Sequence, residues 1–438
     1  MKQIIKRYIE PTHCEWSQLC KRHNADDEII ETRVLDIISK VRDGGDDALR
    51  SLSYEIDGVN IETIEVSDSE RREAFGEVSQ ELRNAIATAA RNITKFHMAQ
   101  RFEPVRVETT PGVLCVQRAV PINRVGLYIP GGTAPLFSTV LMLAIPAKVA
   151  GCKEIVLCTP TDKEGKVAPA VLFAAMVCGV ERIYKVGGAQ AIAAMAYGTE
   201  TISAVDKIFG PGNRYVTKAK EIISKDVAID MPAGPSEVLV IADEDAVPSF
   251  VASDILSQAE HGVDSQAILV CTDNTVADAV CQELERQLQL LPRKDIATKA
   301  LANSSIVVLP DADERIAFVD MYAPEHLIIS TKDPWGVSAR ITSAGSVFIG
   351  NYTPESAGDY ASGTNHTLPT SGWARSHSGV NVDSFVRKIT FQEATPKGLM
   401  ELGDTIVKMA RAEGLDAHAN AVLERLNYLD EKNNTIWI

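Results

Sequence analysis

The chain has 438 residues, which by the usual length of a domain is enough for about two to three domains. Its 45% hydrophobic and 24% charged residues are typical of a globular protein. The formal net charge of −15 argues against nucleic acids and anionic membranes as partners, because both attract basic surfaces.

Further sequence features favour a cytoplasmic location. The first residues mix charges with short apolar pieces and lack the apolar core of a signal peptide. The longest nearly apolar run, Leu136–Ala147, is too short to cross a bilayer. The eight cysteines include no CxxC pair, which favours reduced, mostly buried thiols over a disulfide framework.

The first quarter of the chain predicts an arm, helices and a pair of strands. Two charged segments around Pro11 suggest an arm over the first 30 residues. From Glu28 to Lys95 apolar residues recur at three- and four-residue steps, which predicts helices with breaks at Gly44-Gly45 and Asp57-Gly58. The segment Arg106–Pro121 is rich in Val and Thr and predicts strands.

Residues 124–230 repeat a unit of one strand followed by one helix. The predicted strands are Val125–Ile129, Ile155–Thr159, Arg182–Val186 and Val205–Phe209. The predicted helices are Leu136–Ala150, Val167–Cys178, Ala189–Tyr197 and Arg214–Ser224. Apolar strands that alternate with helices are typical of a parallel sheet covered on both faces, so an α/β fold is expected.

Four of these strands end in turn-forming residues: Pro130-Gly131-Gly132-Thr133, Thr159-Pro160, Gly187-Gly188-Ala189-Gln190 and Gly210-Pro211-Gly212-Asn213. Open parallel sheets bind ligands beyond the carboxyl ends of their strands, and glycine lets backbone N–H groups approach a phosphate. The dinucleotide fingerprint GxGxxG is absent. The residues alone therefore fit either a nucleotide cradle or ordinary tight turns.

A second α/β segment follows. Its predicted strands are Val238–Ala242, Ala267–Thr272, Ser305–Leu309, His326–Ser330 and Ser346–Ile349, and its predicted helices lie near 249–261, 275–290 and 311–320. Two α/β segments in succession predict two related layers with a site between them.

The helix near 249–261 carries Gln258 and His261, which leave nearly the same face because they are three residues apart. On a helical wheel Gln258 falls with Val251 and Ile255, on the side expected to face inward. An inward amide beside an imidazole is either a satisfied polar pair in the core or half of a metal site. The spacing leaves both interpretations open.

Beyond residue 350 the chain is rich in Gly, Ser, Thr and Pro, and it contains Asp359 and His366. Long loops inside compact domains tend to be functional. Two helices are predicted at the C-terminal end, separated by a glycine. Glu413 ends the first helix and His418 lies in the first turn of the second, so both sit at one kink, as a composite site would require.

Seven motifs in chain order together resemble the histidinol dehydrogenase family: GLYIPGGTAPL (126–136), KIFGPGNRYVTKAK (207–220), DMPAGPSEVLVIAD (230–243), DILSQAEHG (254–262), APEHL (323–327), GDYASGTNH (358–366) and DAHAN (416–420). The resemblance covers nearly the whole chain, and motifs of this length are highly specific. It implies two incomplete Rossmann-like domains with an N-terminal arm and a C-terminal helical tail, in an intertwined homodimer. The implied boundaries are 1–30 for the arm, 31–120 with 236–375 for a split first domain, 121–235 for a second, NAD-binding domain, and 376–438 for the dimerisation tail.

The same likeness implies oxidation of L-histidinol to L-histidine through L-histidinaldehyde, with two NAD⁺ reduced and one zinc ion per subunit, as the last steps of histidine biosynthesis. The implied zinc ligands are Gln258, His261, Asp359 and His418 of the partner subunit. The implied NAD contacts are Tyr128, Gln190 and Asn213. The implied substrate contacts, besides the zinc ligands, are Ser236, His326, His366 and Glu413. Glu325 and His326 are the implied general bases.

These residue types suit that chemistry. Histidinol offers an imidazole and an amine, both good ligands for zinc, and both bind unprotonated, so affinity should fall in acid. An unperturbed histidine titrates near neutrality, so His326 can accept a proton at physiological pH. Glu325 can activate the water that the aldehyde must gain before its oxidation. Because neighbours on a strand point to opposite faces, both reach one substrate only if the segment after Pro324 is turned.

Other readings remain to be tested. Aldehyde oxidation through a thiohemiacetal is disfavoured, because Cys158, Cys178 and Cys271 fall at strand or helix positions expected to be buried. A related NAD-dependent dehydrogenase of another amino alcohol, a non-redox zinc hydrolase and a non-catalytic paralogue are the alternatives; the intact set of site residues argues against the last. Arg214, after the GPGN turn, and His377 have no assigned role.

Overall fold

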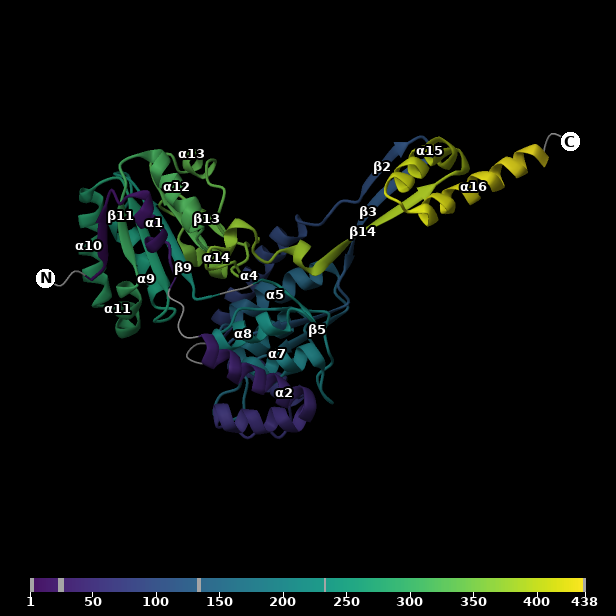
Figure 1. The fold of residues 1–438 in the computed structure, drawn as a ribbon. Helices are drawn as coiled ribbons and strands as arrows, with labels where there is room; N and C mark the ends of the chain where they lie inside the picture. The colour runs from purple at the N-terminus through teal and green to yellow at the C-terminus, as the bar shows by residue number, and fades with distance from the viewer. Residues whose placement is uncertain (1–3, 23–26, 132–134, 232–233, 436–438) are drawn as a thin grey trace. The chain divides into compact units, whose positions relative to one another are not determined.

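The computed structural model describes residues 4–22, 27–131, 135–231 and 234–435, which form two parallel sheets and one antiparallel sheet. By their internal contacts they divide into a first unit, Met1–Gln100 with Ile122–Phe385, and a second unit, Arg101–Pro121 with Val386–Ile438 (Figure 1). The first unit contains both parallel sheets. None of the helices described is long and apolar enough to cross a membrane.

The first parallel sheet, called the β9 sheet, has the strand order β1-β11-β10-β9-β12-β13. Its strands are β1 (Lys6–Ile9), β9 (Glu237–Ala242), β10 (Gln266–Cys271), β11 (Ser305–Val308), β12 (His326–Ser330) and β13 (Ser346–Ile349). Every residue of β9 to β12 is buried, which explains their unbroken apolar character.

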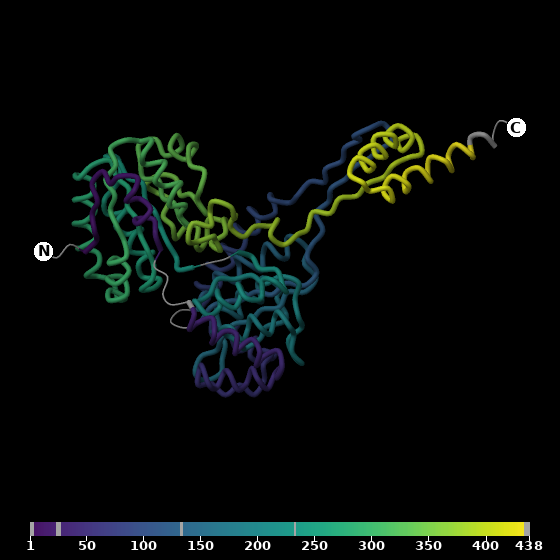
Figure 2. The backbone as a smooth tube through the Cα atoms, viewed as in Figure 1, coloured from purple at the N-terminus to yellow at the C-terminus, as the bar shows by residue number. Residues whose placement is uncertain are grey.

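Helices cover both faces of the β9 sheet. One face packs against α9 (Pro248–Ala259), α10 (Asn274–Leu288) and α11 (Lys294–Ala302). The opposite face packs against α1 (His13–Leu19), α12 (Ala312–Tyr322) and α13 (Pro334–Ser338). Strand β1 lies beside β11, so the start of the chain joins a sheet built from its second half (Figure 2).

The second parallel sheet, called the β4 sheet, has the strand order β6-β5-β4-β7-β8. Its strands are β4 (Arg124–Tyr128), β5 (Glu154–Cys158), β6 (Arg182–Tyr184), β7 (Lys207–Phe209) and β8 (Ala228–Ile229). One face packs against α2 (Asp27–Leu52), α7 (Gly188–Tyr197) and α8 (Arg214–Ile223). The other packs against α3 (Asp68–Glu77), α4 (Gln80–Met98), α5 (Phe137–Ala150) and α6 (Pro169–Val177).

The predicted α/β fold is confirmed, and each strand predicted between residues 124 and 349 is present with ends shifted by at most two residues. One grouping is corrected. The helices within residues 31–120 were assigned to a domain with 236–375, whereas α2, α3 and α4 pack against helices of the β4 sheet. The physical reason is their apolar face: Val34, Ile37 and Val41 are buried in one cluster with Ile192 of α7.

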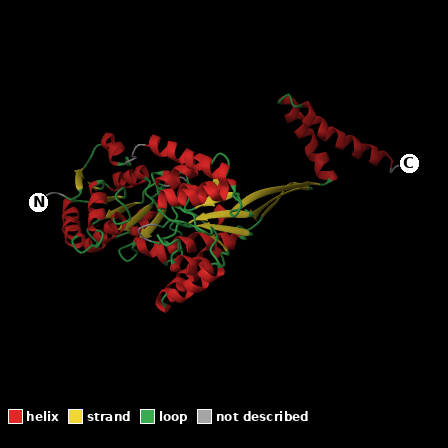
Figure 3. Ribbon diagram, turned by 90° about the horizontal axis from the view of Figure 1, so that it is seen from below, coloured by secondary structure: helices red, strands yellow, loops and turns green. Residues whose placement is uncertain are grey.

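The second unit contains an antiparallel sheet and a pair of helices (Figure 3). The predicted strands of Arg106–Pro121 are β2 (Val105–Thr110) and β3 (Val113–Pro121), and β14 (Val386–Ala394) pairs with β3. The helices are α15 (Pro396–Ala412) and α16 (Asp416–Thr435). Glu413 caps α15 and Gly414 takes a left-handed φ of 73°, which confirms the predicted kink.

Residues 350–385 are largely irregular, with a short helix α14 (Glu355–Tyr360) and two turns of 3₁₀-helix, η2 (Trp373–Arg375) and η3 (Val382–Phe385). A π-helical turn, η1 (Ser53–Asp57), follows α2. Two predicted features lie partly outside the described residues. They are the turn Pro130-Gly131-Gly132-Thr133, of which Gly132 and Thr133 are not described, and the loop before β9, of which Pro232 and Ala233 are not described.

Candidate active site

The two predicted bases lie together at the start of β12. Ala323 ends α12 in the left-handed region, with a φ of 51°, and the chain bends at Glu325 before the strand begins at His326. Glu325 Oε2 lies 3.6 Å from His326 Nδ1, and both side chains are buried. The predicted turn after Pro324 is therefore present, and it allows neighbouring side chains to share one space.

Both bases contact the backbone of one residue in the adjacent strand. The N–H of Glu237 donates to Glu325 Oε2 at 2.9 Å, and the carbonyl oxygen of Glu237 lies 3.2 Å from His326 Nδ1. That second contact places a proton on Nδ1, because a carbonyl oxygen only accepts. Nε2 of His326 is buried without a hydrogen-bond partner among the described residues. It is the nitrogen left to face a substrate.

Three carboxylates surround the His326 ring. Glu355 Oε1 lies 3.7 Å from Nδ1, and Asp359 Oδ1 lies 3.7 Å from Nε2. Burial alone would lower the pKa of His326, but the charges of Glu355, Glu325 and Asp359 raise it well above its ordinary value. Burial also raises the pKa of Glu325 and of Glu355 to about 8 each. The cluster therefore holds protons at neutral pH when no cation is present.

Side chains of α14 and of the end of α9 and the turn after it could hold a metal ion. Ligand atoms of His261, Glu355 and Asp359 all lie within 4.8 Å of one another. Burial lowers the pKa of His261, which favours the neutral ring that metals bind. The Gln258 side chain is fully buried, and neither its Oε1 nor its Nε2 has a hydrogen-bond partner among the described residues. An orphaned buried amide is costly, and a metal or a substrate would satisfy it.

The expected substrate contacts His366 and Ser236 border this cluster. His366 Nδ1 lies 2.8 Å from the backbone oxygen of Asp359, and its Nε2 lies 3.2 Å from the Thr139 hydroxyl on α5. The ring thus joins the loop after residue 360 to a helix of the β4 sheet. Ser236 directly precedes Glu237 and lines a small cavity with Asp264.

The three expected NAD contacts lie at the carboxyl edge of the β4 sheet. Tyr128 ends β4, and its buried hydroxyl accepts a hydrogen bond from Gly188 N at 3.0 Å. Gln190 is buried in the first turn of α7. Asn213 caps α8, its Oδ1 accepting from the backbone of the second and third residues beyond it. Parallel strands place all three at one edge, where ligands bind in such sheets.

Two predicted site residues belong to the second unit. Glu413 and His418 are exposed there, at the kink between α15 and α16. The structure therefore brings Gln258, His261 and Asp359 to one region with the bases, and leaves the contribution of His418 as a prediction.

Glu355 is the acidic group that the sequence analysis missed. It is almost fully buried, and its Oε2 has no hydrogen-bond partner among the described residues. A signal was available: Glu355 and Asp359 are four residues apart, so on a helix they share one face. The surrounding Gly, Ser and Thr residues predict a loop, so the short helix α14 was not predicted.

The cysteines described are all free thiols, and the three considered as nucleophiles, Cys158, Cys178 and Cys271, are unsuited to that role. Burial raises the pKa of Cys178 and of Cys271 to about 12 each, and it raises that of Cys158 further. A thiol must lose its proton to attack, so these remain inert.

Known proteins match this chain over almost its whole length. A family profile described as histidinol dehydrogenase matches residues 20–426. The histidinol dehydrogenase of Bacteroides fragilis (strain YCH46) is 59% identical over 417 residues, covering 95% of this chain and 97% of that protein. That of Xanthomonas euvesicatoria pv. vesicatoria (strain 85-10) is 51% identical over 423 residues, covering 94% and 98%. The crystal structure of histidinol dehydrogenase from Elizabethkingia anophelis matches with a TM-score of 0.96 at 52% identity, covering 98% of this chain and 100% of that one. The chain therefore belongs to the histidinol dehydrogenase family of oxidoreductases.

Proposed function

We propose that this protein oxidises L-histidinol to L-histidine through L-histidinaldehyde, consuming two NAD⁺ and one water and releasing two NADH. The relatives that it matches bear the name of this activity. The observation that carries the proposal is the buried cluster at β12, in which Gln258, His326 Nε2 and Glu355 Oε2 lack hydrogen-bond partners among the described residues. Such groups are expected where a metal and a polar substrate bind.

The side chains present fit a zinc ion. Neutral His261, the carboxylate of Asp359 and the unpartnered Gln258 oxygen would hold it, with His418 of the partner subunit. When bound, zinc would supply a Lewis acid that anchors the imidazole and amine nitrogens of histidinol.

The protein's own bases would then move the protons. In the first oxidation, His326 Nε2 accepts the hydroxyl proton while a hydride leaves the carbon that bears this hydroxyl, and an aldehyde results. Glu325 next takes a proton from the water that adds to the aldehyde carbon. Once His326 has released its first proton to solvent, it accepts the remaining hydroxyl proton of the hydrate anion as the second hydride leaves to NAD⁺, and the product is a carboxylate. The carboxylates around His326 suit this role, because they stabilise its protonated form after each transfer.

Tyr128, Gln190 and Asn213 would hold NAD⁺, which accepts one hydride in each oxidation. They lie at the carboxyl edge of the β4 sheet, the edge that binds nucleotides in doubly wound folds. The eight free cysteines are in keeping with a reducing compartment, so we place the enzyme in the cytoplasm.

A homodimer with shared sites completes the proposal. Glu413 and His418 are exposed on the second unit, and both are expected at a site whose other residues lie in the first. Exposed apolar side chains on that unit, among them Phe391 and Met409, are consistent with burial against a second copy.

The stoichiometry of oxidation tests this function. Purified protein, loaded with zinc and given excess NAD⁺, should form two NADH for each histidinol consumed, with histidine as the product. Glycinol and leucinol serve as comparison substrates and should react far more slowly. One NADH per histidinol, faster oxidation of another amino alcohol, or zinc-dependent hydrolysis without NAD⁺ would each overturn the proposal and favour a related dehydrogenase or a hydrolase.

A further inference from the structure

The backbone of one residue contacts both proposed bases. Glu237 opens strand β9, and it contacts Glu325 through its N–H at 2.9 Å and His326 through its carbonyl oxygen at 3.2 Å. The strands continue this alignment, since Val238 pairs with His326. A displacement of the Glu237 backbone would therefore move the partners of both bases at once.

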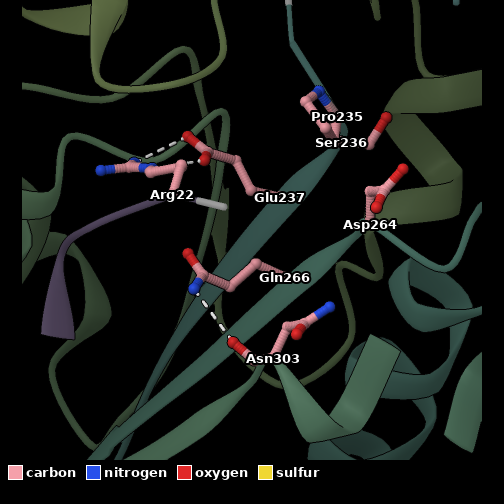
Figure 4. Close-up of a pocket in the computed structure, with 7 residues that line it drawn as sticks. All are labelled: Arg22, Pro235, Ser236, Glu237, Asp264, Gln266 and Asn303. Carbon is pink, nitrogen blue, oxygen red and sulfur yellow. Dashed lines mark hydrogen bonds and ion pairs between the residues drawn. The ribbon is translucent and has the colours of Figure 1, made fainter. Parts of the chain in front are cut away.

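The side chain of Glu237 is fixed in turn by Arg22, which lies just after α1 near the start of the chain. Arg22 Nε donates to Glu237 Oε2 at 2.8 Å, and Nη2 donates to Oε1 at 2.9 Å, as Figure 4 shows. Planar two-point pairing sets the orientation of a carboxylate as well as its charge. The Glu237 side chain is 1% exposed, so its charge depends on this partner.

Arg22 is itself held from several sides. Its Nη2 also donates to the backbone oxygen of Tyr322 at 2.7 Å, and Nη1 donates to the backbone oxygen of Cys20 at 2.8 Å. Its guanidinium carbon lies 3.7 Å from the centre of the Tyr322 ring. Tyr322 ends α12, one turn before Glu325 in the chain, so the same arginine contacts both segments that lead to the bases.

The pair also lies beside one of the expected substrate contacts, Ser236. Arg22 and Glu237 line a small cavity with Ser236 and Asp264 (Figure 4). Ser236 is the serine expected to contact the substrate, and it is bonded directly to Glu237. A fixed Glu237 therefore restrains Ser236 as well as the bases.

We propose that Arg22 and Glu237 are positioning residues that hold Glu325 and His326 in register for proton transfer. The proposal rests on the function assigned above to those two bases. It adds a role for the N-terminal segment, which supplies no residue to the proposed metal or NAD positions. Neither Arg22 nor Glu237 needs to touch the substrate, because both act through the backbone N–H and carbonyl groups of Glu237.

Substitution of the arginine tests this role. In Arg22→Gln, kcat for histidinol oxidation should fall about 10- to 100-fold, the usual effect of losing a residue that orients a site. Zinc content should stay near the wild-type value, because the proposed ligands of this chain's first unit lie on α9, just after it and on α14. Arg22→Lys keeps the charge but cannot pair with both oxygens. Arg22→Gln should also lower thermal stability, and Arg22→Lys should recover most of that loss while its kcat stays low. A purely structural role would not separate stability from kcat in this way.

A control is the ion pair between buried Lys185 and partly exposed Glu70, joined at 3.0 Å far from β12 in the sequence. Glu70→Gln should lower thermal stability and leave kcat unchanged. Should Arg22→Gln fail to fold, Glu237→Gln, which keeps the side-chain shape, takes its place. Wild-type kcat in folded, zinc-loaded Arg22→Gln or Glu237→Gln would overturn the proposal, and so would a kcat that recovers together with stability in Arg22→Lys.

The two hypotheses can fail separately. If the wild-type protein formed no NADH from histidinol, the proposed function would fall and kcat could not be read. Crystal structures of the wild-type protein and Arg22→Gln would then decide the positioning role. It predicts that the contacts of Glu237 with Glu325 and His326 lengthen or break in the variant, and unchanged contacts would overturn it.

Discussion

At the carboxyl edge of the β4 sheet, polar side chains find partners in the local backbone, whereas beside the β9 sheet several buried polar atoms have none. The Tyr128 hydroxyl and the Asn213 amide oxygen both accept backbone N–H groups. In contrast, Gln258 and His326 Nε2 are buried and unpartnered among the described residues. The first region is complete in the isolated chain. The second requires groups from outside, which is what a metal, a substrate and a second subunit would supply.

The largest expected effect comes from breaking the incomplete region. His261→Ala should lose zinc and lower kcat/KM on the order of 10³-fold or more, because a metal contributes several kcal/mol to such reactions. His377→Ala, which alters a histidine outside the cluster, should keep both zinc and activity. Zinc content by atomic emission and initial rates of NADH formation measure the two effects. Full zinc occupancy in His261→Ala would remove this residue from the ligand set.

Sharing of the site between subunits can be tested with two inactive variants. Co-expressed His261→Ala and His418→Ala chains should recover about a quarter of the wild-type activity, because random pairing makes half of the dimers mixed and each mixed dimer has one intact site. His261→Ala with Asp359→Asn should recover none, since both defects fall in the same half of each site. No recovery in the first mixture would mean that His418 does not act across the dimer.

The next effect concerns Glu325. Burial raises its pKa to about 8, and a base acts only when deprotonated. Oxidation of added histidinaldehyde should therefore increase with pH, reach half of its maximum near pH 8 and level off above it. Glu325→Gln should slow this step about 10²-fold while the first oxidation is less affected. NADH formed per histidinol would then approach one, with aldehyde trapped by semicarbazide. Equal losses in both oxidations would show that Glu325 is not specific to the hydration step.

The fold was largely predictable from the sequence because apolar strands and helices alternate through residues 124–349. Strands β1, β8 and β14 were not predicted. β1 pairs with β11 about three hundred residues away, and β14 is exposed along almost its entire length, so neither carries a local apolar pattern. The placement of α2 against α7 likewise depends on which apolar faces fit together, which periodicity does not reveal.

The position of a site residue was predictable where the pattern of its own helix or turn was enough to place the side chain. The inward position of Gln258 followed from the helical wheel, and the structure finds it fully buried. The turned segment at Glu325 followed from the requirement that two neighbouring side chains reach one substrate, and Pro324 is compatible with such a turn. The pairing of Arg22 with Glu237 joins residues 215 positions apart, so no spacing or local motif indicates it. Contacts of this kind become visible only when the chain is folded.

A smaller effect is expected in the region that is already complete. Asn213→Ala should raise KM for NAD⁺ about 10-fold and also lower stability by about 1 kcal/mol, because the side chain caps α8. Asn213→Asp keeps an oxygen that can cap the helix but loses the amide N–H groups. It should retain stability while KM for NAD⁺ stays high. Steady-state kinetics and thermal unfolding separate the two roles, and an unchanged KM in both variants would exclude Asn213 from the NAD site.

The smallest effect returns to the region with unpartnered groups. Asp254 lies on α9 one turn before Gln258, and burial raises its pKa from 3.8 to about 7. Between these values the folded protein holds a proton that the unfolded chain has released, so stability falls as pH rises through this window. Asp254→Asn removes the titration, and the variant should therefore unfold a few degrees above the wild-type protein at pH 8, with a smaller difference at pH 4. The gain should shrink when zinc is added, because a nearby cation favours the ionised carboxylate. Calorimetry with and without zinc would measure both changes. If the increase in unfolding temperature were the same with and without zinc, the ion would have to lie away from α9.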